Sequence, residues 1–85
     1  MRQYVIRYFT PESMNWSVIG AGDDEGLSRL IKNSPISKDM IREVFELTPV
    51  FMETYKFQLN QLDKLLWSGS YDENTVRYLE IDALF

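Results

Sequence analysis

Hydrophobic and polar residues alternate in the first part of the chain, as they do in β-strands. Tyr4, Ile6 and Tyr8 fall on one side of a two-residue period, which predicts a strand over residues 3–9. A turn-rich segment follows, and residues 16–19 repeat the strand pattern before a glycine-containing stretch ends it. The two segments predict an antiparallel hairpin.

The pattern then changes to helical spacing. Leu27, Leu30 and Ile31 share one side of a helix that begins after the acidic residues 23–25. Carboxylates at a helix start bind the free amides and offset the positive end of the backbone dipole. Pro35 marks the end of this helix, because the residue before a proline resists the helical conformation.

A second helix is predicted after Ser37, which can cap it through its hydroxyl. Arg42 and Glu46 are spaced for an ion pair along this helix. Its apolar side would comprise Met40, Ile41, Val44, Phe45 and Leu47.

A third, long helix is predicted from Thr48 to Trp67. Thr48 followed by proline is a favourable helix opening, and large apolar residues then recur at helical spacing as far as Leu66. Residues 50–59 also fit a strand, since Phe51, Tyr55, Phe57 and Leu59 would share one side of it. We prefer the helix because its spacing continues beyond Asn60, where a strand would stop.

β-Branched and aromatic residues predict a last strand over residues 75–81, with Arg77, Leu79 and Ile81 on one side. We expect it to pair with the N-terminal hairpin. Residues 1–85 would then form a single small α+β domain. It would contain a small antiparallel sheet, made of the hairpin and the C-terminal strand, with two or three helices packed on one face.

Composition narrows the function, because the 85 residues include no histidine and no cysteine. These side chains supply most acid–base catalysis near neutral pH, most zinc ligation and all thiol chemistry. Serine has no activating histidine and no Ser-x-x-Lys spacing. We therefore expect a protein that is not an enzyme and holds no cofactor or metal. An enzyme using carboxylates, such as a Glu80–Asp82 pair on one face of the last strand, is the third-ranked hypothesis.

The distribution of charge along the chain indicates which class of molecule the protein would bind. The net charge is −4, and residues 39–85 hold nine of the 13 acidic side chains but only four of the nine basic ones. With no basic stripe, direct contact with nucleic acid or anionic lipid is disfavoured. An acidic half can attract a basic protein surface. The first residues lack a signal-peptide pattern, and no run approaches the roughly 20 apolar residues that cross a membrane, so we expect a cytoplasmic protein.

Large amphipathic rings are more numerous than so small a domain can bury. Tyrosine and tryptophan at a surface are typical of the residues that dominate protein interfaces. Combined with the acidic residues near them in sequence, they predict a partner-binding surface. Its members are Trp67, Tyr71, Asp72, Glu73, Tyr78, Glu80 and Asp82.

These observations favour a non-catalytic protein-binding module: a small inhibitor, antagonist or adaptor that occupies a site on a larger protein. A stand-alone, cysteine-free, acidic character is typical of small accessory proteins of phages and mobile elements, and the carboxylates could imitate the phosphates of nucleic acid. The alternative is a self-assembling structural subunit, in which the free edge of the hairpin pairs with another copy.

Overall fold

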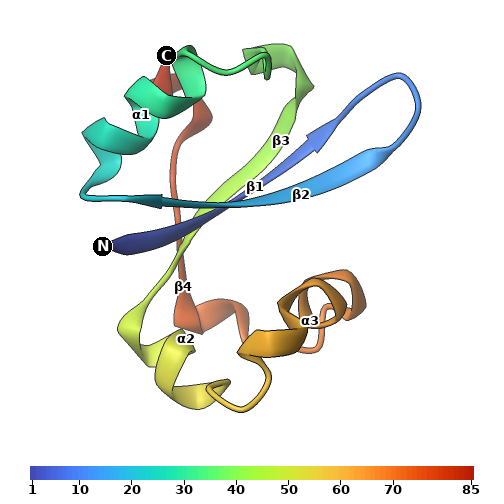
Figure 1. The fold of residues 1–85 in the computed structure, drawn as a ribbon, viewed down its shortest axis with the longest axis vertical. Coiled ribbons are helices and arrows are strands. Elements are labelled where there is room, and N and C mark those ends of the chain that lie inside the picture. The colour runs from blue at the N-terminus through green and yellow to red at the C-terminus, as the bar shows by residue number, and fades with distance from the viewer.

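The chain folds into one antiparallel sheet with helices on both of its faces (Figure 1). The computed structural model describes residues 1–85. The strands are β1 (Arg2–Phe9), β2 (Met14–Ala21), β3 (Ile41–Leu47) and β4 (Val76–Tyr78), in the order β2-β1-β3-β4. The helices are α1 (Asp24–Lys32), α2 (Pro49–Thr54) and α3 (Leu62–Ser68). The α+β class and the antiparallel sheet are as predicted.

The hairpin and the first helix are also confirmed. β1 and β2 pair in an unbroken register from Arg2 opposite Ala21 to Phe9 opposite Met14. Asp23 caps α1, because its side chain accepts a 2.7 Å hydrogen bond from the backbone N–H of Gly26. This is the role that the acidic loop was expected to have.

The predicted second helix is wrong: residues 38–40 form a single 3-10 turn, and residues 41–47 are the central strand β3. A central strand is buried on both faces, so its apolar residues do not alternate with polar ones. In addition, the register with β1 shifts at Arg42, which places Ile41 and Val44 on the same face three residues apart. A buried strand with a bulge therefore has the apolar spacing of a helix.

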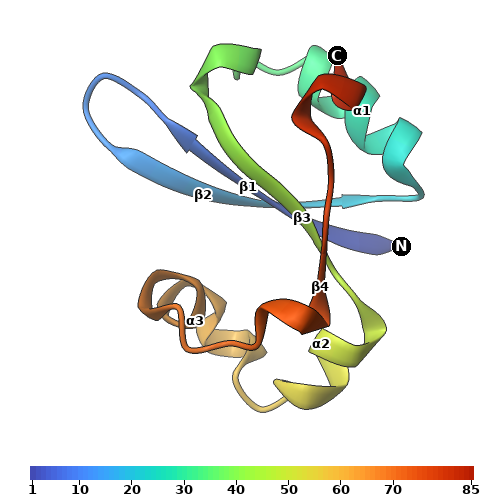
Figure 2. The same ribbon diagram turned by 180° about the vertical axis from the view of Figure 1, so that it is seen from behind.

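The last strand is shorter than predicted and has a different partner. It pairs with β3, not with the hairpin, and regular pairing covers Val76–Tyr78. Leu79 adds one hydrogen bond from its N–H to the carbonyl of Val44, at 2.9 Å. Beyond it, residues 81–84 form a 3-10 turn that packs against α1 (Figure 2), where the Ser28 hydroxyl donates a 2.6 Å hydrogen bond to the carbonyl of Leu84.

The predicted long helix is interrupted, and no strand forms in residues 50–59. Thr48 caps α2 by accepting a 3.2 Å hydrogen bond from the N–H of Phe51, and its hydroxyl donates to the carbonyl of Thr75. α2 ends at Thr54, and turns connect it to α3. α3 ends at Gly69, whose φ of 65° lies in the left-handed region that glycine adopts most readily.

Two apolar cores lie on opposite faces of the sheet, which corrects the expectation of helices on one face only. α1 and the C-terminal turn cover the first face, and α2 and α3 cover the second. The first core contains Tyr4, Ile6, Ala21, Leu27, Ile31, Ile41, Val44 and Leu84. The second contains Val5, Phe45, Leu47, Phe51, Leu65, Leu66 and Val76. None of the helices has the length and apolar character needed to cross a membrane.

Candidate protein-binding surface

An aromatic cluster occupies the sheet face beneath α3. At its centre is Phe45 of β3, which is fully buried. Trp16 of β2 meets Phe45 edge to face, with ring centroids 6.3 Å apart, and Tyr78 of β4 lies 5.4 Å from it. Tyr71 stacks on Phe45 at 6.2 Å, and Trp67 of α3 meets Trp16 at 6.1 Å. We call these five residues the aromatic cluster.

The pairing of the strands explains why these rings lie together. Phe45 and Tyr78 are direct register partners, so their side chains lie on the same face of the sheet. Phe45 is also opposite Val5, which is opposite Val18. Trp16 lies two residues before Val18 and therefore projects from the same face. The sheet thus brings together residues that are up to 62 positions apart in sequence, from Trp16 to Tyr78.

The outer part of this cluster is exposed to solvent. Trp67 retains 55% of its surface, Tyr78 44%, and the adjoining Val18 43%. Aromatic side chains lose little conformational freedom when they bind, and their large surfaces give strong contacts. A buried Phe45 with exposed rings around it therefore forms a rigid, partly apolar surface.

An ion pair adjoins the aromatic cluster. Arg7 and Glu43 are register partners across β1 and β3, with guanidinium and carboxylate 3.6 Å apart. The Arg7 guanidinium also lies 5.7 Å from the centre of the Trp16 ring. Two donors here, Arg7 Nε and Trp16 Nε1, are buried and find no acceptor within the protein. Donors of this kind are rare in folded proteins.

The tyrosines of the cluster stay protonated well into the alkaline range. Partial burial of Tyr78, with the neighbouring carboxylate of Glu43, raises its pKa to about 12. Burial likewise raises the pKa of Tyr71, with Glu43 and Glu73 adding to the effect. Both hydroxyls are therefore hydrogen-bond donors at neutral pH.

The structure divides the seven sequence-predicted site residues into two groups. Trp67, Tyr71 and Tyr78 belong to the aromatic cluster. Asp72 and Glu73 follow directly in the next turn, where the Asp72 side chain caps the N–H of Asn74 at 2.9 Å. The charge of Glu73 acts on both Tyr71 and Tyr78. These five predicted residues are neighbours in space.

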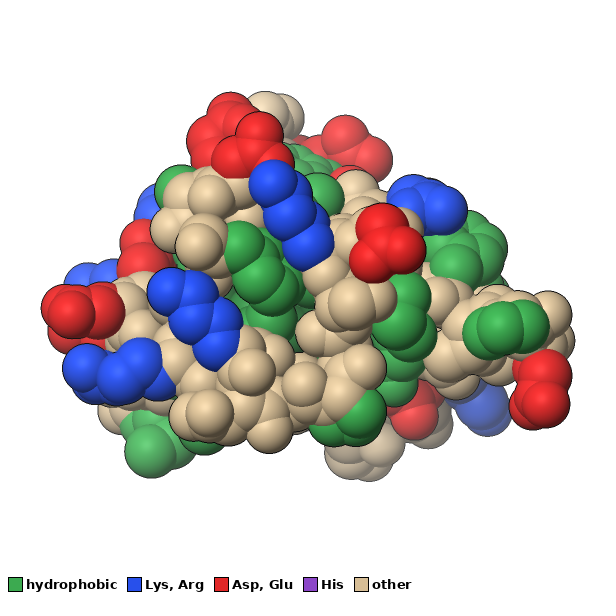
Figure 3. All heavy atoms as spheres, turned by 90° about the horizontal axis from the view of Figure 1, so that it is seen from above, with side chains coloured by type: hydrophobic (Ala, Val, Ile, Leu, Met, Phe, Trp, Pro, Cys, Tyr) green, Lys and Arg blue, Asp and Glu red, His purple; other side chains and the backbone are tan.

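Glu80 and Asp82 lie elsewhere, at the end of the molecule that carries α1. Because the strand ends at Tyr78, they do not form the predicted pair on one strand face. Lys38 pairs with Asp82 at 2.6 Å, and this contact lowers the pKa of the Asp82 carboxyl. Acidic and basic side chains are interspersed over this end (Figure 3), so it does not present one continuous acidic surface.

Sequence reasoning missed Arg7 and Glu43, and it assigned Trp16 only to a general surplus of rings. The signal that finds them is the register of the sheet. Arg7 and Glu43 become neighbours only when residues 41–47 are recognised as a strand beside β1. The helix predicted for that segment would have placed Glu43 far from the hairpin.

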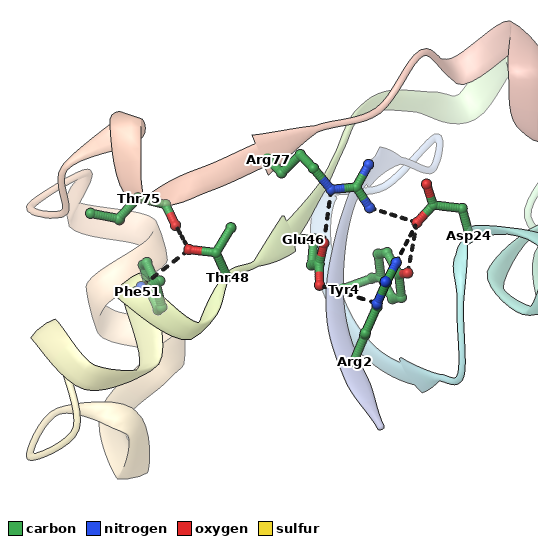
Figure 4. Close-up of polar contacts among 8 residues, drawn as sticks. All are labelled: Arg2, Tyr4, Asp24, Glu46, Thr48, Phe51, Thr75 and Arg77. Atoms are coloured by element: carbon green, nitrogen blue, oxygen red, sulfur yellow. Dashed lines mark hydrogen bonds and ion pairs between the residues drawn. The ribbon is translucent and has the colours of Figure 1, made fainter.

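A polar cluster lies on the opposite face of the sheet and joins four elements, β1, α1, β3 and β4 (Figure 4). Arg77 of β4 donates to Glu46 of β3 at 2.8 Å and to Asp24 of α1 at 2.6 Å. The hydroxyl of the buried Tyr4 donates to the same Asp24 carboxylate at 2.7 Å, and Arg2 lies 3.8 Å from both acids. The charged groups of this cluster pair with one another, and the pairing lowers the pKa of Asp24, mainly through Arg77. The cluster therefore connects α1 to the sheet.

Neither this cluster nor the Arg7–Glu43 ion pair resembles a metal centre, since no group of three or more Asp or Glu side chains is placed to hold an ion. Comparison of the chain with known protein families, curated proteins and solved structures finds no match in any of the three.

Proposed function

We propose that the protein is a non-catalytic binding module that contacts a larger protein through the aromatic cluster. The observation that carries this proposal is the exposure of Trp67 and Tyr78 on either side of the buried Phe45. Exposed aromatic rings on a rigid sheet and helix are typical of the central contacts of protein interfaces.

The polar groups around the cluster indicate what the partner would offer. The Tyr78 hydroxyl, which is protonated at neutral pH, can donate a hydrogen bond to a backbone carbonyl of the partner. Asp72 and Glu73 follow Tyr71 directly in the chain and attract basic side chains. The partner surface that fits is therefore an apolar patch flanked by lysine or arginine. By covering such a patch, the protein would act as an inhibitor, antagonist or adaptor.

Direct imitation of nucleic acid has less support. A mimic of phosphates needs a continuous array of carboxylates, and here many of the acidic side chains are paired with cations. Asp82 pairs with Lys38, and Asp24 pairs with Arg77. The exposed aromatic rings, in contrast, have no partner to cover them within the protein.

The proposal is tested by quantitative affinity capture from a native lysate with the double variant Trp67→Ala/Tyr78→Ala. We expect a stoichiometric partner to be retained by the wild-type protein and lost from the double variant. The matched control is Phe57→Ala, which removes an aromatic ring that is 87% exposed but lies outside the cluster. Equal retention by the wild type and the folded double variant would refute the assignment of this surface.

A further inference from the structure

We propose that β2 pairs with β2 of a second copy of the chain, in antiparallel orientation about a two-fold axis. β2 is the outermost strand of the sheet and has a neighbour on one side only. Its eight residues, Met14–Ala21, include no charge and no proline. Edge strands of monomeric proteins are usually protected by charges, proline or a bulge, and β2 has none of these.

The hydrogen-bond pattern shows which β3 residues face outward from the hairpin. In antiparallel pairing, each residue directs both its backbone groups to one neighbour, and the next residue directs both to the other. The Leu79 N–H bonds to the carbonyl of Val44, so Val44 faces β4. Its partner on β1 is Ile6, which must therefore face β2.

The same alternation continues into β2. Ile6 is opposite Ser17, so Ser17 directs its backbone groups inward to β1. Its neighbours Trp16 and Val18 consequently direct their N–H and carbonyl groups to the free edge. These are the groups that a second strand would bind, and their side chains lie on the face of the aromatic cluster.

The opposite edge of the sheet is protected. Regular pairing in β4 covers three residues, and 3-10 turns lie at 73–75 before it and at 81–84 shortly after it. β4 also carries Arg77, whose guanidinium is engaged with two carboxylates. A sheet with one open and one blocked edge closes as a pair when the open edges meet, whereas a filament would need both edges to be open.

A second copy fits this edge by charge and shape. Two chains of net charge −4 repel one another, but the uncharged β2 adds no repulsion at the contact. With Ser17 opposite Ser17 of the second copy, Trp16 of each chain lies opposite Val18 of the other. Aromatic and β-branched residues form favourable cross-strand pairs, and here the pair occurs twice.

Such a dimer has one continuous sheet, because the two-fold axis is perpendicular to it. Both aromatic clusters would then lie on the same face, side by side. The dimer rests on the backbone of β2 and does not require that the cluster bind a partner. It would, however, give the protein two equivalent surfaces.

The first test is the mass of the 85-residue chain, measured by sedimentation velocity across a range of concentrations. We expect a species of twice the 10.1 kDa chain mass that dissociates on dilution. Val18→Glu, at an exposed position of the free edge, should weaken self-association about tenfold or more. Each chain would then place a negative charge at the contact between the two β2 strands, and the two charges would repel. The control Val50→Glu changes an exposed valine on α2 and should leave the dimer intact. A monomer at every concentration would overturn the proposal.

The second test uses the absence of cysteine from the chain. In the proposed pairing, Ser17 is a non-hydrogen-bonded pair with its own symmetry mate, whose Cα atoms lie about 4.5 Å apart. Ser17→Cys should therefore form an interchain disulfide under mild oxidation. Asn15→Cys, two residues away on the same face, should not, because Asn15 would lie opposite Ile19 of the other chain. Equal cross-linking of the two variants would contradict the two-fold pairing.

Discussion

The indole ring of Trp67, on α3, meets the indole ring of Trp16, on the edge strand β2, edge to face at 6.1 Å. This contact joins α3 to the N-terminal hairpin and also leaves more than half of Trp67 exposed. The same residue therefore has a small role in stability and a large surface available for a partner.

The two roles can be separated by substitution. Trp67→Ala should lower the free energy of unfolding by about 2 kcal/mol, because it removes the contact with Trp16 and the buried part of the indole ring. Phe45→Ala should cost about 3–5 kcal/mol, because it opens a cavity between the rings of Trp16, Tyr71 and Tyr78. Chemical denaturation of the two variants measures both values. A loss for Trp67→Ala as large as that for Phe45→Ala would show that Trp67 belongs to the core.

Glu73 should affect how fast the partner binds more than how stably the domain folds. Glu73→Lys is expected to slow association and to reduce its dependence on salt, because charges at the rim of an interface act mainly on encounter. The change in unfolding free energy should stay within about 0.5 kcal/mol. Association rates at two salt concentrations measure the effect. Glu53→Lys, on α2, is the matched control, and it should leave the salt dependence unchanged.

The Asp24 carboxylate should make stability depend on acid pH. Its contacts with Arg77 and Tyr4 hold its pKa below the usual 3.8. A lowered pKa in the folded state means that the contribution is complete above 3.8 and is lost as the pH falls through the folded value. Asp24→Asn should therefore cost about 1 kcal/mol at pH 7, a value reduced for solvent screening because the side chain is 44% exposed.

Thermal unfolding of Asp24→Asn and the wild type at several pH values tests this prediction. The difference between the two proteins should shrink below pH 3.8 and disappear in stronger acid. Asp63→Asn, which removes an exposed carboxylate on α3, should show no such convergence. A constant difference at all pH values would mean that Asp24 acts through packing and not through its charge.

Tyr78 should titrate well above the usual range of a tyrosine. Its pKa of about 12 lies above the ordinary value of 10, so the folded state disfavours the phenolate. The corresponding stability is present below pH 10 and is lost as the pH rises through 12. Ultraviolet absorbance of tyrosinate should therefore show a late component that Tyr78→Phe removes. Glu43→Gln should move that component to lower pH, because it removes a neighbouring negative charge.

The elements predicted correctly are those whose signals are local. The hairpin has a two-residue period and a turn, and α1 has its own cap in Asp23. The prediction for residues 41–47 was wrong because the pattern of apolar residues in β3 depends on its neighbours. The strand is buried on both faces and has a bulge at Arg42. No window of sequence carries that information. The prediction of one long helix from Thr48 to Trp67 was wrong for a related reason, since turns between α2 and α3 let both helices pack on the same core.

The candidate surface was predicted in part, for the same reason. Trp67, Tyr71 and Tyr78 were selected by residue type, and the sheet and α3 bring them together around Phe45. Arg7 and Glu43 could not be associated with them without the register of β1 and β3. Glu80 and Asp82 were joined to the group only by their nearness in sequence, and the chain turns away after Leu79.

The strand order has a consequence for how the protein is made. A ribosome releases the hairpin and β3 before residues 76–79 have emerged, so Val44 and Glu46 have backbone groups with no strand to receive them. Phe45 likewise lacks Tyr71 and Tyr78 at that stage. The hairpin and α1 can form during translation, but the sheet is completed by the last strand. The proposed binding surface is therefore complete only once β4 has paired with β3, and a chain that stops before residue 71 would lack both Tyr71 and Tyr78.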